Sequence, residues 1–159
     1  MQHDWTISLR INYSALANQW NASHIASIWT WNNRNALFLW IYNNTTQWQP
    51  YWSIQYAQYW EDYISSNKTV QNTWYNLIFT YNYSTRKYDM YVNWEKRMNW
   101  TFNNQYSLWS NTLYIGATCI NLTQWRIIWK IAKYIIENKK RSDSEAVDYW
   151  NKVKKKYGY

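Results

Sequence analysis

Hydrophobic and polar residues alternate along most of this chain, and this alternation limits the folds that the chain can adopt. Near the N-terminus the apolar residues are Trp5, Ile7, Leu9 and Ile11, and the polar residues between them are Thr6, Ser8, Arg10 and Asn12. Successive side chains of a β-strand point to opposite faces of a sheet. The pattern therefore predicts a strand with one apolar face and one solvent-exposed face.

The same pattern predicts further strands along the chain. They fall at 25–31, 36–42, 51–56, 74–81, 88–93, 113–117 and 127–136. Polar connections are expected at 13–24, 43–50, 57–70, 103–111 and 118–125, and a short hairpin turn at 84–87. Many short strands with such connections indicate an all-β fold, an antiparallel β-sandwich or jelly roll. Because the 159 residues contain no internal repeat or linker, we expect a single domain over 1–159.

The C-terminal segment has a helical pattern instead. Ser142 and Glu145 have the spacing of a capping box, in which each side chain bonds the other residue's backbone amide. Val147, Trp150 and Val153 then share one face. We expect one amphipathic helix over about 142–155, packed against the sheets.

Several segments resemble laminin-G-like, concanavalin A-like lectin domains of microbial and viral type. Residues 73–97, TWYNLIFTYNYSTRKYDMYVNWEKR, are similar to the family's hairpin segment, and LYIGA at 113–117 resembles its glycine-containing strand. Residues 129–158 resemble the family's closing strand, helix start and Lys-Tyr-Gly ending, and WTISLRIN at 5–12 fits its opening strand. The resemblance implies a concanavalin A-like sandwich and recognition of glycans. One departure is Trp94, which stands where the family has a glycine at a position of positive φ.

The acidic and metal-ligating residues do not form a catalytic pattern. A glycosidase on this fold needs two carboxylates at alternate positions of one strand, and only Asp143, Glu145 and Asp148 include that spacing, in the helix. His3 and His24 lack nearby ligands, and the pair Glu61–Asp62 is too small a cluster for calcium. The one cysteine, Cys119, cannot form an intramolecular disulfide. We therefore expect no enzyme, no metal and no cofactor.

The aromatic content favours a binding function. The chain has 15 Trp, 17 Tyr and 3 Phe, more rings than the core of a sandwich of this size holds. Aromatic rings in loops stack on the apolar faces of sugars, while amides and hydroxyls read their hydroxyl groups. We expect ligand contacts from Trp48, Trp52, Trp94, Trp100 and Trp109. The first hypothesis is thus a non-catalytic glycan-binding module on an extracellular or virion surface.

The alternative hypothesis is a self-assembling structural subunit, a viral coat or extracellular filament protein, whose exposed aromatic rings are buried against neighbouring subunits. Eight Asn-x-Ser/Thr triplets suit either exposed location, because such acceptors lie at the surface where they are glycosylated. They are Asn12, Asn21, Asn43, Asn44, Asn67, Asn82, Asn99 and Asn121. The N-terminus does not have the pattern of a Sec-type signal peptide, and no apolar run is long enough to span a membrane.

A basic patch at the C-terminus gives a third, weaker hypothesis. The net charge is +8, and the patch is predicted at Lys139, Lys140, Arg141, Lys154, Lys155 and Lys156. Such a patch can dock nucleic acid or another polyanion. Lysines in the last turn of a helix are also common without any ligand, because the helix dipole favours cations there and water solvates them. Nucleic acid is therefore ranked below glycans and neighbouring subunits as a partner.

Overall fold

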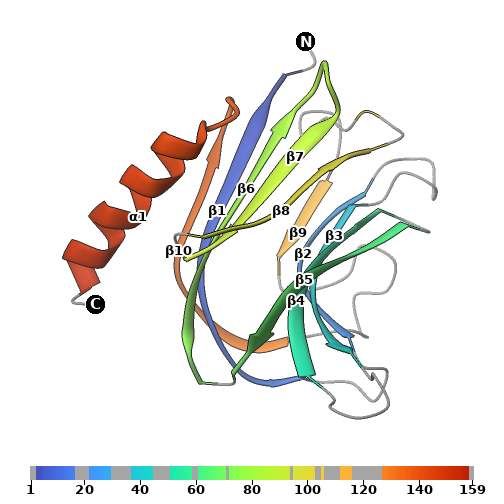
Figure 1. Ribbon diagram of the computed structural model, residues 1–159. Helices are drawn as coiled ribbons and strands as arrows, with labels where there is room; N and C mark the ends of the chain where they lie inside the picture. The colour runs from blue at the N-terminus through green and yellow to red at the C-terminus, as the bar shows by residue number, and fades with distance from the viewer. Residues whose placement is uncertain are drawn as a thin grey trace. The chain divides into compact units, whose positions relative to one another are not determined.

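The computed structural model describes residues 3–16, 22–29, 37–44, 51–58, 61–70, 72–93, 95–102, 105, 112–115 and 127–157. Side chains are described at 3–12, 70, 72–93, 95–102, 105 and 130–157. Within these ranges the chain forms ten β-strands and one α-helix (Figure 1). The chain divides into two compact units, one of residues 1–11, 74–105 and 131–159, the other of 12–73 and 106–130.

The strands form two five-stranded sheets. The first has the order β10-β1-β6-β7-β8, with β10 at Ile127–Glu137, β1 at Trp5–Leu16, β6 at Trp74–Asn82, β7 at Lys87–Val92 and β8 at Glu95–Thr101. The second has the order β5-β4-β3-β2-β9, with β5 at Glu61–Thr69, β4 at Tyr51–Gln58, β3 at Leu37–Asn44, β2 at Ala22–Trp29 and β9 at Thr112–Ile115. The pairs β6–β7, β7–β8, β2–β3, β2–β9, β3–β4 and β4–β5 are antiparallel.

All eight predicted strands are confirmed, with shifted ends, but two strands were not predicted. The segment 57–70, predicted as a connection, contains β5, and β8 was not recognised. Both strands lie at the end of a sheet's strand order. β5 and β8 carry many charged and polar residues, which discourage the pairing of a sheet edge with other molecules, so these two strands lack the apolar alternation of the predicted strands.

One face of the first sheet is apolar and buried, as the alternation predicts. Its buried side chains are Trp5, Ile7, Leu9, Ile11, Leu77, Phe79, Tyr81, Tyr88, Met90 and Val92, with Phe102 after β8. The ring centroids of Trp5 and Tyr81 lie 5.2 Å apart, and those of Tyr88 and Phe102 stack at 4.8 Å. Full burial of each such side chain stabilises the fold by roughly 1.5–3 kcal/mol.

The other face of the first sheet was predicted to be exposed to solvent, and this prediction is wrong. Thr6 and Ser8 are fully buried, and Arg10 is 6% exposed. The helix and the segment before it cover them: the Thr6 hydroxyl donates to the Lys139 carbonyl at 2.7 Å and accepts from the Arg141 amide at 3.0 Å. The guanidinium of Arg10 lies 3.6 Å from the ring centroid of Tyr157. Thr6 and Arg10 on this face therefore contact the C-terminal segment instead of water, while the buried Ser8 hydroxyl has no hydrogen-bond partner among the described residues.

The helix α1 spans Asp143–Tyr157 and lies over the first sheet (Figure 1). The capping box is confirmed: the Glu145 amide donates to the Ser142 hydroxyl at 3.3 Å, and the Ser142 amide donates to the Glu145 carboxylate at 2.8 Å. The buried face differs from the predicted one. It contains Ala146 together with Trp150 and Val153, whereas Val147 is 40% exposed. The spacing 146, 150, 153 follows the helical repeat more closely than a stripe that includes 147.

The hairpin that joins β7 and β8 depends on an asparagine. Asn93, between β7 and β8, has φ 59°. Its carbonyl oxygen Oδ1 accepts from the Asn76 amide at 3.2 Å, and its own amide donates to the Asn76 carbonyl at 2.7 Å. Asparagine tolerates this left-handed region better than other residues with a Cβ. The positive φ is thus found at Asn93, and Trp94 lies outside the described residues.

Candidate functional site

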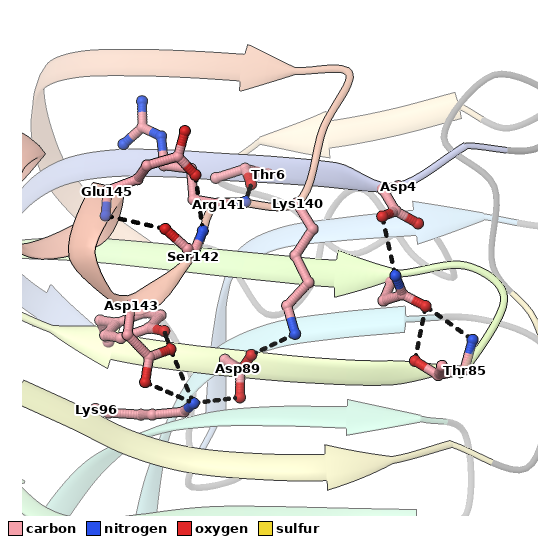
Figure 2. Close-up of polar contacts among 12 residues, drawn as sticks. Asp4, Thr6, Thr85, Asp89, Lys96, Lys140, Arg141, Ser142, Asp143 and Glu145 are labelled. Atoms are coloured by element: carbon pink, nitrogen blue, oxygen red, sulfur yellow. Dashed lines mark hydrogen bonds and ion pairs between the residues drawn. The ribbon is translucent and has the colours of Figure 1, made fainter.

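Asp89 on β7 is the centre of a charged cluster on the helix-covered side of the first sheet. Its side chain is 8% exposed. Lys96 Nζ lies 2.9 Å from one carboxylate oxygen, and Lys140 Nζ lies 2.7 Å from the other (Figure 2). Lys96 comes from the neighbouring strand β8, and Lys140 from the segment between β10 and α1. Two cations on one nearly buried carboxylate satisfy a group that would otherwise be costly to bury.

Asp143, the first residue of α1, extends this cluster. The Tyr91 hydroxyl donates to Asp143 Oδ1 at 2.6 Å, and Lys96 Nζ donates to the same oxygen at 3.1 Å. These two hydrogen bonds lower the pKa of the Asp143 carboxyl. Burial, followed by the bond to Asp143, raises the pKa of the Tyr91 hydroxyl, and the bonds of Lys96 to both aspartates raise its pKa although burial opposes this. At neutral pH the cluster thus contains an ionised carboxylate, a neutral tyrosine and charged lysine.

A hollow of about 610 Å³ opens beside this cluster. Its lining comes from β7, β8 and the residues around the start of α1: Lys87, Tyr88, Asp89, Lys96, Asn99, Trp100, Thr101, Lys140 and Asp143. Hollows of about 300–1,000 Å³ commonly hold small ligands. The described lining offers ammonium, carboxylate, amide and hydroxyl groups.

Trp100 is the one of the five predicted ligand aromatics whose side chain is described, and it lines this hollow. Strand alternation directs Asn99 and Thr101 toward the side of Asp89, and Trp100 toward the opposite side. β8 is the last strand in its sheet, and Trp100 is 44% exposed there. Trp52 lies in β4, opposite Asn43 and Thr69. Trp48, Trp94 and Trp109 lie outside the described residues.

The two aspartates of the hollow were not predicted as site residues from the sequence. Asp89 is an acid at a position of β7 where alternation predicts an exposed side chain, and Asp143 was assigned only to the helix start. They lie 54 positions apart in the sequence, so no spacing rule joins them. An isolated acid on a polar strand face is the one available signal, and many solvated residues share it.

The two carboxylates are close together, yet they do not form an acid–base pair. Asp89 and Asp143 both contact Lys96 Nζ, at 2.9 and 3.1 Å, which keeps these oxygens within about 6 Å of each other. A glycosidase needs one carboxyl group that stays protonated. Here Asp143 has a lowered pKa and Asp89 is held by two ammonium groups. The arrangement suits binding of polar groups better than proton transfer.

The predicted glycosylation sites occupy different environments. Asn12 is half-buried on β1, Asn82 is half-buried at the end of β6, and Asn99 is exposed on β8. Asn82 organises its turn: its amide donates to Asp4 at 3.0 Å, and its Oδ1 accepts from the Thr85 amide at 2.8 Å (Figure 2). Asn43 and Asn44 lie in β3 and Asn67 in β5. Asn21 and Asn121 lie outside the described residues.

Half of the predicted basic patch is engaged in ion pairs. Lys139 lies 2.6 Å from Glu145, Lys140 lies 2.7 Å from Asp89, and Arg141, 7% exposed, lies 2.5 Å from Glu137. The other half, Lys154, Lys155 and Lys156, is exposed in the last turn of α1. The six cations therefore do not form one free surface.

The described residues show no group of three or more His, Cys, Asp or Glu side chains that would hold a metal ion. Among the helices in the described part of the chain, none is long and apolar enough to cross a membrane.

Comparison with known proteins identifies the fold. No family model matches the sequence, and no curated protein matches it. A Bacteroides ovatus protein, provisionally named as carbohydrate-binding, is similar in structure, with a TM-score of 0.69 and 17% identity over 91% of this chain and 40% of that one. A heptameric SAP-like pentraxin from Limulus polyphemus gives 0.69 at 13% identity, over 92% of this chain and 69% of the pentraxin. The CBM40 module of a Ruminococcus gnavus IT-sialidase, bound to α2,3-sialyllactose, gives 0.59 at 12% identity, over 93% and 83%.

These similarities define the class of fold. The chain is an all-β, antiparallel sandwich of the concanavalin A-like, jelly-roll type, with one C-terminal helix. The predicted fold class and the resemblance to lectin-type domains are thereby confirmed at the level of structure. The chain spans 40% of the length of the Bacteroides ovatus protein that it matches.

Proposed function

We propose that this protein is a non-catalytic, single-domain carbohydrate-binding module that holds its ligand in the hollow between β7, β8 and the start of α1. The hollow itself carries the proposal, because charged and hydrogen-bonding side chains line it. Sugars have many hydroxyl groups that need polar partners. Asn99, Thr101 and Asp143 supply exposed polar groups.

The charge of the hollow favours acidic glycans. Its lining has three lysines and two aspartates, a net charge of +1, and the whole chain has +8. Lys87 is exposed and has no ion pair among the described residues. A carboxylated or sulfated sugar would gain a charge-assisted hydrogen bond from such a group. The similar fold of a CBM40 module with bound sialyllactose supports this class of ligand.

The proposal includes an extracellular or virion-surface location, because carboxylated and sulfated glycans occur on the outside of cells. The absence of an acid–base carboxylate pair at the hollow supports a binding role without turnover. The similarity in fold to a carbohydrate-binding module adds further support.

The test is glycan-array screening followed by calorimetry on the best ligand, with unmodified protein from bacterial cytoplasm. Lys87→Ala should weaken binding of an acidic glycan about tenfold, the effect of roughly 1.4 kcal/mol for one lost charge-assisted hydrogen bond. Lys130→Ala is the matched control, since Lys130 is exposed on β10, at the opposite end of the sheet order. Binding by wild-type protein that Lys87→Ala leaves unchanged would place the ligand elsewhere, and no binding to any glycan would contradict the proposal.

Self-assembly remains the second candidate, and the edge strand β10 favours it. β10 is 11 residues long, stands at the end of the first sheet and exposes Ile131 and Ile136. Long apolar edge strands pair with other molecules. Light scattering on wild type and Ile136→Lys separates the candidates: an assembly that the lysine dissolves supports a structural subunit, and a monomer in both cases excludes this interface.

A further inference from the structure

Asn99 differs from Asn82, another Asn-x-Ser/Thr asparagine whose side chain is described. Asn82 uses its amide and its carbonyl oxygen in the β6–β7 turn, where they contact Asp4, Ser84 and Thr85. Asn99 is exposed on β8, and its side chain forms no hydrogen bond with another described residue. A substituent on the Asn99 amide nitrogen therefore costs the fold no described contact, whereas one on Asn82 competes with the bond to Asp4.

Asn99 also lies in the wall of the hollow. Asn99 pairs with Asp89 across β7 and β8, and its side chain lines the same hollow as Asp89 and Trp100. The acceptor triplet Asn99-Trp100-Thr101 thus forms part of the hollow's own wall. A group attached to the Asn99 amide begins within the hollow, beside the polar groups that a bound sugar would use.

We propose that Asn99 is an N-glycosylation site whose linked glycan occupies this hollow. The co-reactant is a lipid-linked glycosyl phosphate or diphosphate in a glycosylating export pathway. The amide nitrogen forms a bond to the anomeric carbon, the bond from that carbon to the phosphate oxygen breaks, and the lipid phosphate leaves while the nitrogen loses one proton. No atom is oxidised or reduced. The modified chain then carries its own sugar where an external glycan binds, so glycosylation and external binding exclude each other; this last step rests on the proposed function.

The test compares the full chain made in bacterial cytoplasm, without N-glycosylation, with the full chain secreted by glycosylating eukaryotic cells. Peptide mass spectrometry measures occupancy at each acceptor. Acetylation with limiting reagent measures the reactivity of Lys87, which lines the hollow, and calorimetry measures affinity for the glycan found with the bacterial protein. Thr101→Ala, which removes only the Asn99 acceptor, is made in both hosts. Because each sequence is compared with itself across hosts, any direct effect of the Thr101 hydroxyl cancels.

The expected result is high occupancy at Asn99, several-fold protection of Lys87 in the secreted wild type, and affinity about tenfold lower than in the bacterial wild type. Thr101→Ala should show neither difference between hosts. An unmodified Asn99 in the secreted protein overturns the proposal, and so does an occupied Asn99 that leaves Lys87 as reactive as before. If neither host's protein binds any glycan, the proposed function fails, yet occupancy and lysine acetylation still decide whether the Asn99 glycan fills the hollow.

Discussion

At the scale of single residues, Asp89 is the most consequential polar side chain in the described part of the chain. It is nearly buried, and its two oxygens face Lys96 at 2.9 Å and Lys140 at 2.7 Å. The two lysines reach it from different elements, β8 and the segment before α1. The carboxylate therefore ties the helix start to the sheet as well as shaping the hollow.

Asp89→Asn should lower the free energy of unfolding by about 1–3 kcal/mol, because two ammonium groups then face a neutral amide. The lower part of that range is favoured by the exposure of the lysine side chains, 32% and 27%. Urea unfolding at neutral pH measures the change. Asp148→Asn, an exposed position on α1, is the control and should change stability by no more than about 0.5 kcal/mol. Equal effects of the two substitutions would show that the cluster adds nothing.

At the scale of elements, the β7–β8 hairpin depends on the left-handed conformation of Asn93. Asn93→Ala should destabilise the protein more than Asn93→Gly, by about 1 kcal/mol, because the Cβ of alanine makes positive φ unfavourable and glycine has no Cβ. Both variants lose the hydrogen bond from the Asn76 amide. The difference in their free energies of unfolding therefore measures the cost of positive φ alone. Thermal or urea unfolding of both variants measures it, and a glycine variant no more stable than the alanine variant would contradict the geometry.

The cap of α1 should respond to acid. The Lys139 ammonium and the Ser142 amide lower the pKa of Glu145 from 4.5 to about 2. Since the folded-state pKa is the lower one, Glu145 stabilises the fold above pH 4.5, and this contribution is lost as the pH falls toward about 2. Stability should thus fall more steeply across this window in wild type than in Glu145→Gln. Urea titrations between neutral pH and pH 2 test this, and parallel curves would mean that the cap carries no charge-dependent stability.

Much of the element scale could be predicted from the sequence, and the exceptions have physical causes. Alternation located the central strands, and the spacing of Ser142 and Glu145 located the helix start, because both are local patterns. β5 and β8 were missed since both are rich in charged and polar residues, a common feature of sheet edges. The buried Thr6, Ser8 and Arg10 were misassigned because their cover, 139–157, is distant in the sequence. The hollow escaped prediction for the same reason.

At the scale of the whole molecule, the net charge of +8 raises the question of polyanion binding. Three of the six cations in the predicted patch form ion pairs with Glu145, Asp89 and Glu137, and their release would leave Glu145 and Glu137 without a described ion pair and Asp89 with Lys96 alone. Lys154, Lys155 and Lys156 are the members of that patch without a described ion pair. Contacts to nucleic acid through this patch should therefore involve about three phosphates.

Duplex DNA binding should accordingly be weak, with a slope of log affinity against log salt no steeper than about −3, because each neutralised phosphate contributes about −0.9. Replacing Lys154, Lys155 and Lys156 together by alanine should remove most of that slope. Lys139→Ala should leave it unchanged, since Lys139 lies 2.6 Å from Glu145 and is already neutralised. Fluorescence anisotropy across a salt series measures all three proteins. A slope near −6 that Lys139→Ala also reduces would mean that the ion pairs open for phosphate, and nucleic acid would then rank beside glycans as a partner of this fold.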